Sequence, residues 1–181
     1  DFKSQKNQDR SLNSNIIFPY FLGSPFNLKY SLDLIQKDST YTSNENLIDI
    51  ELNLKKLKVG VGFQKNKSNT DGQTQFVEDF NSKLFNISSE YLIVDSFDKF
   101  ISEKFKFLVR YGLGEKIQLN NETRLTRYKL ELGKKFDFSE RFKLQSLFIK
   151  EKINSKNLVN NELIRFGGSK SIRGFDDNSI F

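Results

Sequence analysis

Apolar and polar residues alternate with a period of two along most of the chain. Between positions 26 and 36 the even positions are apolar from Phe26 to Leu34, and most odd positions are polar, among them Lys29 and Asp33. The same alternation returns in the ranges 46–54, 57–64, 85–93 and 105–113. Because successive side chains of a β-strand point to opposite faces, the pattern predicts strands with one apolar and one polar face.

The alternation predicts about eight strands of roughly 9–12 residues each. They cover Arg10–Phe18, Phe26–Gln36, Asn46–Leu54, Leu57–Gln64, Phe85–Ile93, Phe105–Leu113, Glu122–Gly133 and Arg141–Lys150. Strands of soluble proteins average about 5–6 residues, whereas about 9–11 residues cross a bilayer when the strand is tilted by about 45°. The lengths therefore favour an all-β, antiparallel transmembrane barrel.

The connections between these strands alternate between two classes. One class comprises Pro19–Pro25, Lys55–Lys56, Asp95–Ser102 and Lys134–Glu140. The other comprises Lys37–Glu45, Lys65–Gln75, Glu115–Asn121 and the long segment 151–181. The second class is longer on average and richer in Asn, Ser, Thr and Lys, which is typical of the outer loops of outer-membrane barrels.

Composition narrows the possible chemistry. The 181 residues include no His, Cys, Met or Trp. A Ser-His-Asp triad, a Cys nucleophile and an ordinary zinc or haem site are therefore excluded, and we predict no catalytic residue, metal ligand or cofactor. The net charge of +6 could indicate nucleic-acid binding, but the lysines are spread along the chain rather than clustered, so nucleic acid is not a predicted partner.

A soluble antiparallel sandwich or a lipocalin-like barrel would show the same alternation. The mean hydropathy is −0.56, and no run approaches the ~18–20 apolar residues of a membrane helix. A transmembrane barrel also has a low mean hydropathy, because lumen-facing polar residues alternate with lipid-facing apolar ones. The many charged residues on the polar faces favour the membrane barrel.

The last twenty residues contain a glycine-rich motif. Phe166 is followed at once by Gly167 and Gly168, and Ile172-Arg173-Gly174-Phe175 follows three residues later. This stretch resembles the sixth extracellular loop of the BamA/TamA and two-partner-secretion (FhaC-like) superfamily of outer-membrane barrels. That loop carries Phe-x-Gly-Gly-x-x-x-aliphatic-Arg-Gly-aromatic, and here the spacer after Phe166 is missing.

The resemblance implies that the loop folds back into the barrel lumen and that Arg173 anchors it. A guanidinium is always charged and binds carboxylates through two hydrogen bonds, so it suits a partly dry pore. Gly167, Gly168 and Gly174 would allow close backbone approaches, and Phe175 could pack against the inner wall. The alternative is that Arg173 is a solvated loop arginine. Asp176 and Asp177 are interpreted as solvated rather than as a metal or catalytic pair.

The resemblance also implies how much of a barrel is present. Barrels of the superfamily have sixteen strands, and this loop lies between the eleventh and twelfth. The whole chain, 1–181, is then expected to be a partial barrel, with strands four to eleven and the start of the sixth loop at 151–181. The terminal strands, the preceding periplasmic domains and the acidic partners of Arg173 are expected to lie outside it.

The polar faces carry carboxylates that we interpret as pore residues rather than acid/base groups: Asp33, Glu51, Glu90 and Glu131. They could pair across neighbouring strands with Lys29, Arg110, Arg127 or Lys129. By resemblance, the expected function is the insertion or secretion of other proteins at the outer membrane. The implied partners are membrane lipid, unfolded protein substrates, and periplasmic or accessory assembly subunits. A passive channel or porin is the main alternative, followed by a soluble binding domain.

Overall fold

The computed structural model describes residues 2–4, 10–37, 40–70, 77–95, 102–119, 121–139 and 142–162. These residues form one antiparallel sheet of a short strand and eight long ones. The strands are β1 (Phe2–Ser4), β2 (Arg10–Phe18), β3 (Phe26–Lys37), β4 (Tyr41–Leu54), β5 (Leu57–Thr70), β6 (Phe80–Val94), β7 (Glu103–Gln118), β8 (Asn121–Asp137) and β9 (Lys143–Ser155). The predicted all-β, antiparallel class is confirmed.

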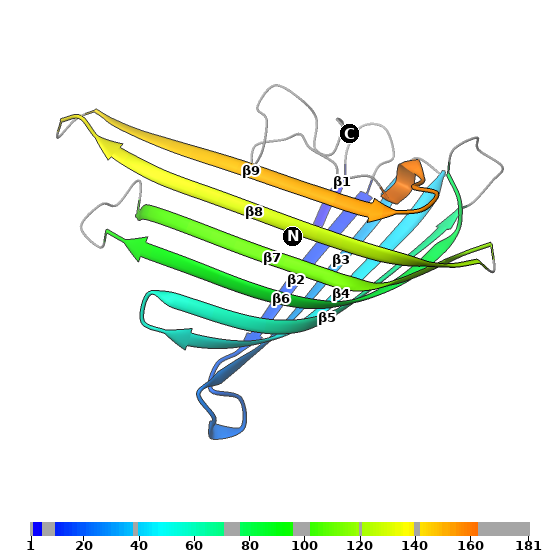
Figure 1. Ribbon diagram of the computed structural model, residues 1–181, viewed down its shortest axis with the longest axis horizontal. Helices are drawn as coiled ribbons and strands as arrows, with labels where there is room; N and C mark the ends of the chain where they lie inside the picture. Colours follow the sequence, from blue (N-terminus) through cyan, green and yellow to red (C-terminus); the bar gives the residue numbers. More distant parts are fainter. Residues whose placement is uncertain are drawn as a thin grey trace.

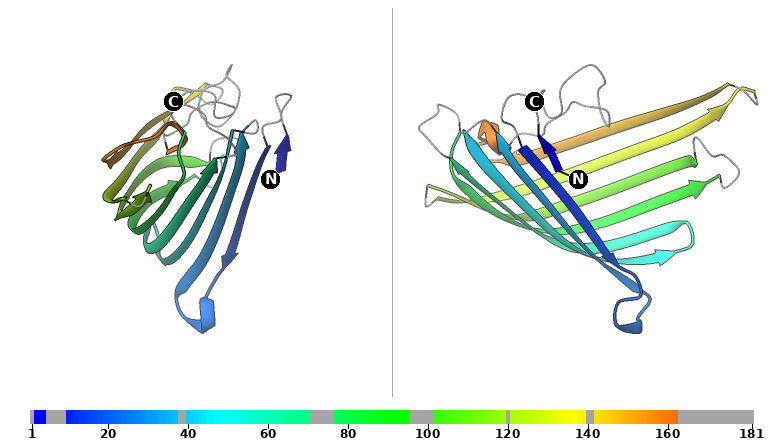
Figure 2. Two further views of the ribbon diagram at one scale, coloured as in Figure 1. Left: turned by 90° about the vertical axis from the view of Figure 1, so that its right-hand side faces the viewer. Right: turned by 180° about the vertical axis from the view of Figure 1, so that it is seen from behind.

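The strands follow one another in the sheet in the order of the sequence, so every connection is a simple hairpin (Figure 1). The sheet is long and bends into a trough (Figure 2). It does not close into the predicted barrel within the described residues, where β1 and β9 form the two edges. Two 3-10 turns, η1 (Phe21–Gly23) and η2 (Asn160–Glu162), complete it, and no helix in the described ranges is long and apolar enough to span a membrane.

Most long strands extend further than the alternation predicts. Strand β4 begins at Tyr41 rather than Asn46, and β5 continues through Thr70 into a segment predicted to be a loop. β9 likewise reaches Ser155, five residues beyond its predicted end. In these extensions both faces of the sheet are largely polar, so hydrophobic periodicity vanishes although the ladder of backbone hydrogen bonds continues.

Among the connections between strands, the predicted contrast in length is therefore wrong; the long segment of the second class lies mostly outside the described residues. At one end of the sheet the strands are joined by residues 19–25, 55–56, 95–102 and 138–142. At the other end, which also carries η2, they are joined by residues 38–40, 71–79 and 119–120. We call these the turn end and the η2 end. Most of the polar residues that the sequence assigns to longer loops lie in the strands instead.

The two faces of the sheet have opposite polarity. On the convex face large apolar side chains are open to the surroundings: Phe85 is 53% exposed and Ile87 56%. On the concave face charged side chains are buried, with Asp49 1% exposed and Lys116 0%. In a soluble protein the apolar face of a sheet is buried and the charged face is exposed to water. This sheet does the reverse.

Candidate functional site

The concave face is the candidate site, because charged side chains from distant strands meet there. A guanidinium nitrogen of Arg110, in β7, lies 2.9 Å from a carboxylate oxygen of Asp49, in β4. Strands β5 and β6 lie between them, and adjacent strands are about 4.8 Å apart. Only the bend of the sheet brings two such side chains together, which identifies this face as the inside of the trough.

Glycine creates the space for this pair. Gly62 of β5 stands directly opposite Asp49 in the register. A Cβ atom at Gly62 would lie 1.9 Å from Oδ1 of Asp49 and 2.9 Å from the backbone oxygen of Ile48. Gly112 of β7 likewise leaves space for the side chain of Asn86, whose Oδ1 atom would lie 2.4 Å from a Cβ atom added at Gly112. The absent side chains let Asp49 and Asn86 lie flat against the sheet.

A second charge centre surrounds Arg127 of β8. Its guanidinium lies 2.7 Å from Glu151, on the neighbouring strand β9, and 3.4 Å from Glu45, on β4 across the trough. A hollow of about 180 Å³ opens between these groups. It is lined by Glu45, Gln64, Asn86, Arg110, Arg127, Lys129 and Glu151. Its lining carries three cations, Arg110, Arg127 and Lys129, against two carboxylates, Glu45 and Glu151, so the wall is polar with charges of both signs.

Further ion pairs continue the network along the trough. Glu131 lies 2.8 Å from Lys106 and 2.9 Å from Lys129, and Lys58 lies 3.2 Å from Glu90. Towards the turn end, Lys135 lies 2.9 Å from Asp95. The ordinary requirement that a buried charge be paired is met at each of these positions.

The sequence places the four carboxylates of the polar faces together on one face but gives most of them the wrong partners. The register places Asp33, Glu51, Glu90 and Glu131 on the concave side, as predicted. Of the expected pairs among the named residues, the structure contains Lys129 with Glu131, which share a strand rather than lying across neighbouring ones. Arg110 and Arg127 instead pair with carboxylates that were not singled out, because curvature joins strands that are not neighbours.

The chain after β9 turns back onto the concave face. The Lys116 Nζ atom, on β7, donates hydrogen bonds to a Glu162 carboxylate oxygen at 2.7 Å and to the Asn157 backbone oxygen at 2.9 Å. The Asn161 side-chain amide donates at 2.8 Å to both the Ser68 hydroxyl and the Glu78 backbone oxygen. The two residues that end η2 are thus fixed inside the trough. We call this arrangement the η2 seat.

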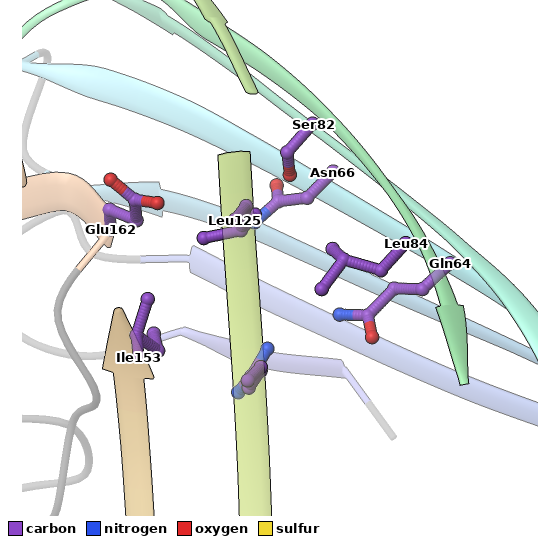
Figure 3. A pocket seen from close by; sticks show the side chains of 8 residues that line it. Gln64, Asn66, Ser82, Leu84, Leu125, Ile153 and Glu162 are labelled. Atoms are coloured by element: carbon purple, nitrogen blue, oxygen red, sulfur yellow. The ribbon is translucent and has the colours of Figure 1, made fainter. Parts of the chain in front are cut away.

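Beside the η2 seat is a small hollow of about 20 Å³, the size of one water molecule. Figure 3 shows Glu162 on one side of it, near Leu125 and Ile153, facing the side chains of Gln64, Asn66, Ser82 and Leu84. The second carboxylate oxygen of Glu162, Oε1, is buried and has no hydrogen-bond partner among the described residues. The hollow beside the seat is therefore lined by both polar and apolar side chains.

The motif residues predicted from the sequence lie outside the described residues. These are Gly167, Gly168, Arg173, Gly174 and Phe175, together with Asp176 and Asp177. The residues that do bring the segment into the trough, Lys116 and Glu162, were missed. Lys116 occupies a polar position of the alternation like many other lysines, and the sequence contains no signal that distinguishes it.

The apolar band on the convex face shifts steadily across the sheet. In β3 it runs from Phe26 to Leu34 and is centred on Tyr30. The row of register partners of Tyr30 continues through Ile48, Phe63, Phe85, Leu113, Thr126 and Asn154. In β9, however, the apolar convex residues are Leu144 and Phe148, centred on Ser146, eight residues from Asn154.

This shift measures the tilt of the strands relative to the band. At β6, halfway across, the band is centred on Ser89, four residues from the Tyr30 row at Phe85. The centre of the band thus moves by roughly 1.3 residues from each strand to the next. At ~3.3 Å per residue and ~4.8 Å between strands, this shift corresponds to a tilt of about 40°. The strands of outer-membrane barrels are tilted by about 35–45°. The band is therefore straight in space although it is oblique in the register.

Aromatic side chains gather where the band meets the turn end. The ring centroids of Tyr91 and Phe105 lie 6.2 Å apart, and Phe138 lies 5.7 Å from Phe142 and 6.5 Å from Phe136. Rings are favoured at the interface between hydrocarbon and water, where an amphipathic environment suits them.

Within the part of the chain that the structure describes, no three His, Cys, Asp or Glu side chains form a group that could hold a metal ion. Comparisons with protein-family models, with curated proteins and with solved structures gave no match.

Proposed function

We propose that the chain forms the central part of an outer-membrane β-barrel that inserts or secretes other proteins. One observation supports a membrane-spanning barrel. The convex face carries a straight apolar band that the strands cross at about 40°, and the concave face on the other side of the sheet carries paired charges. In water the exposed convex face would be a very large apolar patch. In a bilayer that same face gains stability, because lipid tails cover it.

In the proposed barrel the concave face lines the lumen. Its charges are arranged as compensated pairs, such as Arg110 with Asp49 and Arg127 with Glu151. A wall of this kind can hydrate a passing polypeptide without holding it by one strong charge. Such a barrel works without a nucleotide or a cofactor, since the chemistry needed is hydration, shielding and gating.

The protein-handling role is inferred from the C-terminal motif. In the superfamily that it resembles, the sixth loop enters the lumen and its arginine anchors it there. The η2 seat supports this reading, because it holds the chain inside the trough at Glu162, eleven residues before Arg173. The proposal gives Arg173 the anchoring role, with Gly167, Gly168, Gly174 and Phe175 supporting it. Unfolded outer-membrane or secreted proteins are the proposed substrates.

The experiment that tests this function is quantitative proteomics of the outer membrane and the secreted fraction after depletion of the full-length protein. Loss of many unrelated barrels would indicate a general assembly factor. Loss of one secreted protein, with other barrels intact, would indicate a dedicated transporter. Unchanged proteomes with altered uptake of small solutes would overturn the proposal in favour of a passive channel.

A further inference from the structure

The convex face carries a row of basic side chains at the η2 end, just beyond the apolar band. Lys65 of β5 stands directly opposite Lys83 of β6. Glu115 of β7 is opposite Lys83, and Arg124 of β8 is opposite Glu115. Lys65, Lys83 and Arg124 are all exposed, and we call these three residues the basic row.

The two lysines of the basic row border the apolar band directly. The next residues inward on the same face are Phe63 beside Lys65 and Phe85 beside Lys83, which belong to the apolar band, and Thr126 beside Arg124. In β9, where the band has shifted, Lys150 and Lys152 follow the last apolar residue on that face, Phe148. Lys65, Lys83 and Arg124 share one row of the register, and in β9 Lys150 and Lys152 continue the basic border where the band has shifted.

The charges of this border are compensated only in part, since Glu115 stands opposite both Lys83 and Arg124. The basic row and the adjacent outer row together contain four basic residues, Lys65, Lys67, Lys83 and Arg124, against two acidic ones, Glu115 and Glu122. No ion pair within 4.0 Å joins Lys65, Lys83 or Arg124 to another described residue. On the concave face, in contrast, most cations have a carboxylate within 4.0 Å, among them Arg110, Lys116 and Arg127.

Two lysines directly opposite one another on neighbouring strands repel each other. An anion placed between them would remove this repulsion. Among the described residues, the turn end has no such row on the convex face: there the band ends in aromatic rings, with the Lys134 ammonium 4.9 Å from the ring centre of Phe136. The two borders of the band are thus chemically different, and one of them has an excess of positive charge.

We propose that the basic row binds the phosphate monoesters of anionic lipid headgroups in the leaflet that contacts the η2 end. This inference depends on the proposed membrane-spanning function. Charge complementarity selects the occupant, since a group of basic residues at the edge of an apolar band faces headgroups and not solution or tails. Each lysine supplies a compact ammonium, and Arg124 supplies a fork that matches phosphate oxygens.

The test uses the full-length protein in a nonionic detergent, titrated with diphosphoryl lipid A as a probe and followed by native mass spectrometry. The triple variant Lys65→Gln/Lys83→Gln/Arg124→Gln should bind about 100-fold more weakly, since each surface cation contributes roughly fivefold. Lys134→Gln, on the same face at the opposite border, is the matched control and should bind like the wild type. Higher ionic strength should weaken wild-type binding.

Equal binding by the wild type and the triple variant would overturn the proposal, as would no binding by either. Full competition by inorganic phosphate at equal concentration would show a free-anion site and would overturn the assignment to lipid. Insertion into phosphatidylcholine vesicles, assayed separately by protease protection, distinguishes the two proposals. A protein that inserts without binding the probe refutes the basic row alone, and one that fails to insert refutes the membrane-spanning function.

Discussion

The ammonium group of Lys116 lies 2.7 Å from the carboxylate of Glu162, and both side chains are almost completely buried. Forty-six positions separate these residues in the sequence. A lysine that is fully removed from solvent needs a compensating charge, because its desolvation is costly. Glu162 supplies that charge, so the pair couples the wall of the trough to the segment that follows β9.

Replacing Lys116 by Met should release this segment and destabilise the folded protein by about 3–5 kcal/mol, because Glu162 would keep a buried charge without its cation. Lys58→Met is the matched control: it removes the partner of Glu90, but at a more exposed position, and should cost at most about 1 kcal/mol. Urea unfolding of the full-length protein in vesicles, followed by electrophoretic mobility, measures both. Similar midpoints for the two variants would contradict a structural role of the η2 seat.

The reversed pair Lys116→Glu/Glu162→Lys tests whether the coupling is electrostatic. The double variant should recover stability relative to either single reversal, because opposite charges again meet in the buried site. The same urea experiment yields the coupling free energy from the four proteins. Additive losses from the two single changes would indicate that the residues act independently.

Gly62→Ala should destabilise the sheet by about 1–3 kcal/mol, because the new Cβ would collide with the side chain of Asp49 and the backbone of Ile48. Gly133→Ala is the control, since its added Cβ would meet no atom nearer than 3.5 Å. The unfolding midpoints should differ in that order. If Gly62→Ala is tolerated as well as Gly133→Ala, the close approach of Asp49 is not required for stability.

Ile87→Lys places a charge within the apolar band, where the side chain is now 56% exposed on the convex face. In a bilayer this should cost about 2–4 kcal/mol and reduce the inserted fraction. Ser31→Lys adds the same charge to the concave face and should insert normally. The fraction protected from protease after mixing with vesicles measures the difference. Equal insertion would mean that the convex face does not contact lipid.

Arg173→Ala in the full-length protein should lower the temperature at which the folded band disappears on gels and should reduce the export or assembly of substrate. The expectation follows from the anchoring role that the resemblance assigns to Arg173. Lys170→Ala removes a charge from the same segment at a variable position of the motif, and should leave both measurements near wild type. An Arg173→Ala protein with unchanged gel behaviour and unchanged export would remove the motif as an argument for the function.

The alternation of residue types was sufficient to predict the strands and the two faces of the sheet. Arg10–Phe18 was predicted with its correct bounds, and the even positions of β3 lie together on the convex face as expected. This succeeds because a period of two is a local property of an extended backbone. Prediction from the alternation fails near the η2 end, where Lys65 and Lys67 make the convex face polar and the contrast between the two faces is lost.

The ion-pair partners could not be predicted. Pairing across neighbouring strands is the natural expectation from a flat sheet. Arg110 instead reaches Asp49 three strands away, and Arg127 reaches Glu45 four strands away, because the concave side of a bent sheet is shorter than its convex side. Curvature is a property of the whole sheet, and no local pattern of residues reports it.

The sequence by itself determined the all-β class, the order of the strands, the polarity of each face and the chemistry that the chain lacks. Each of these depends on residue type or on spacing along one strand. Only the tertiary structure decided which charges meet, how far the apolar band tilts against the register, and that Lys116 receives Glu162 inside the trough. These features depend on the register and the bending of many strands together, so they are set only when the whole sheet is assembled.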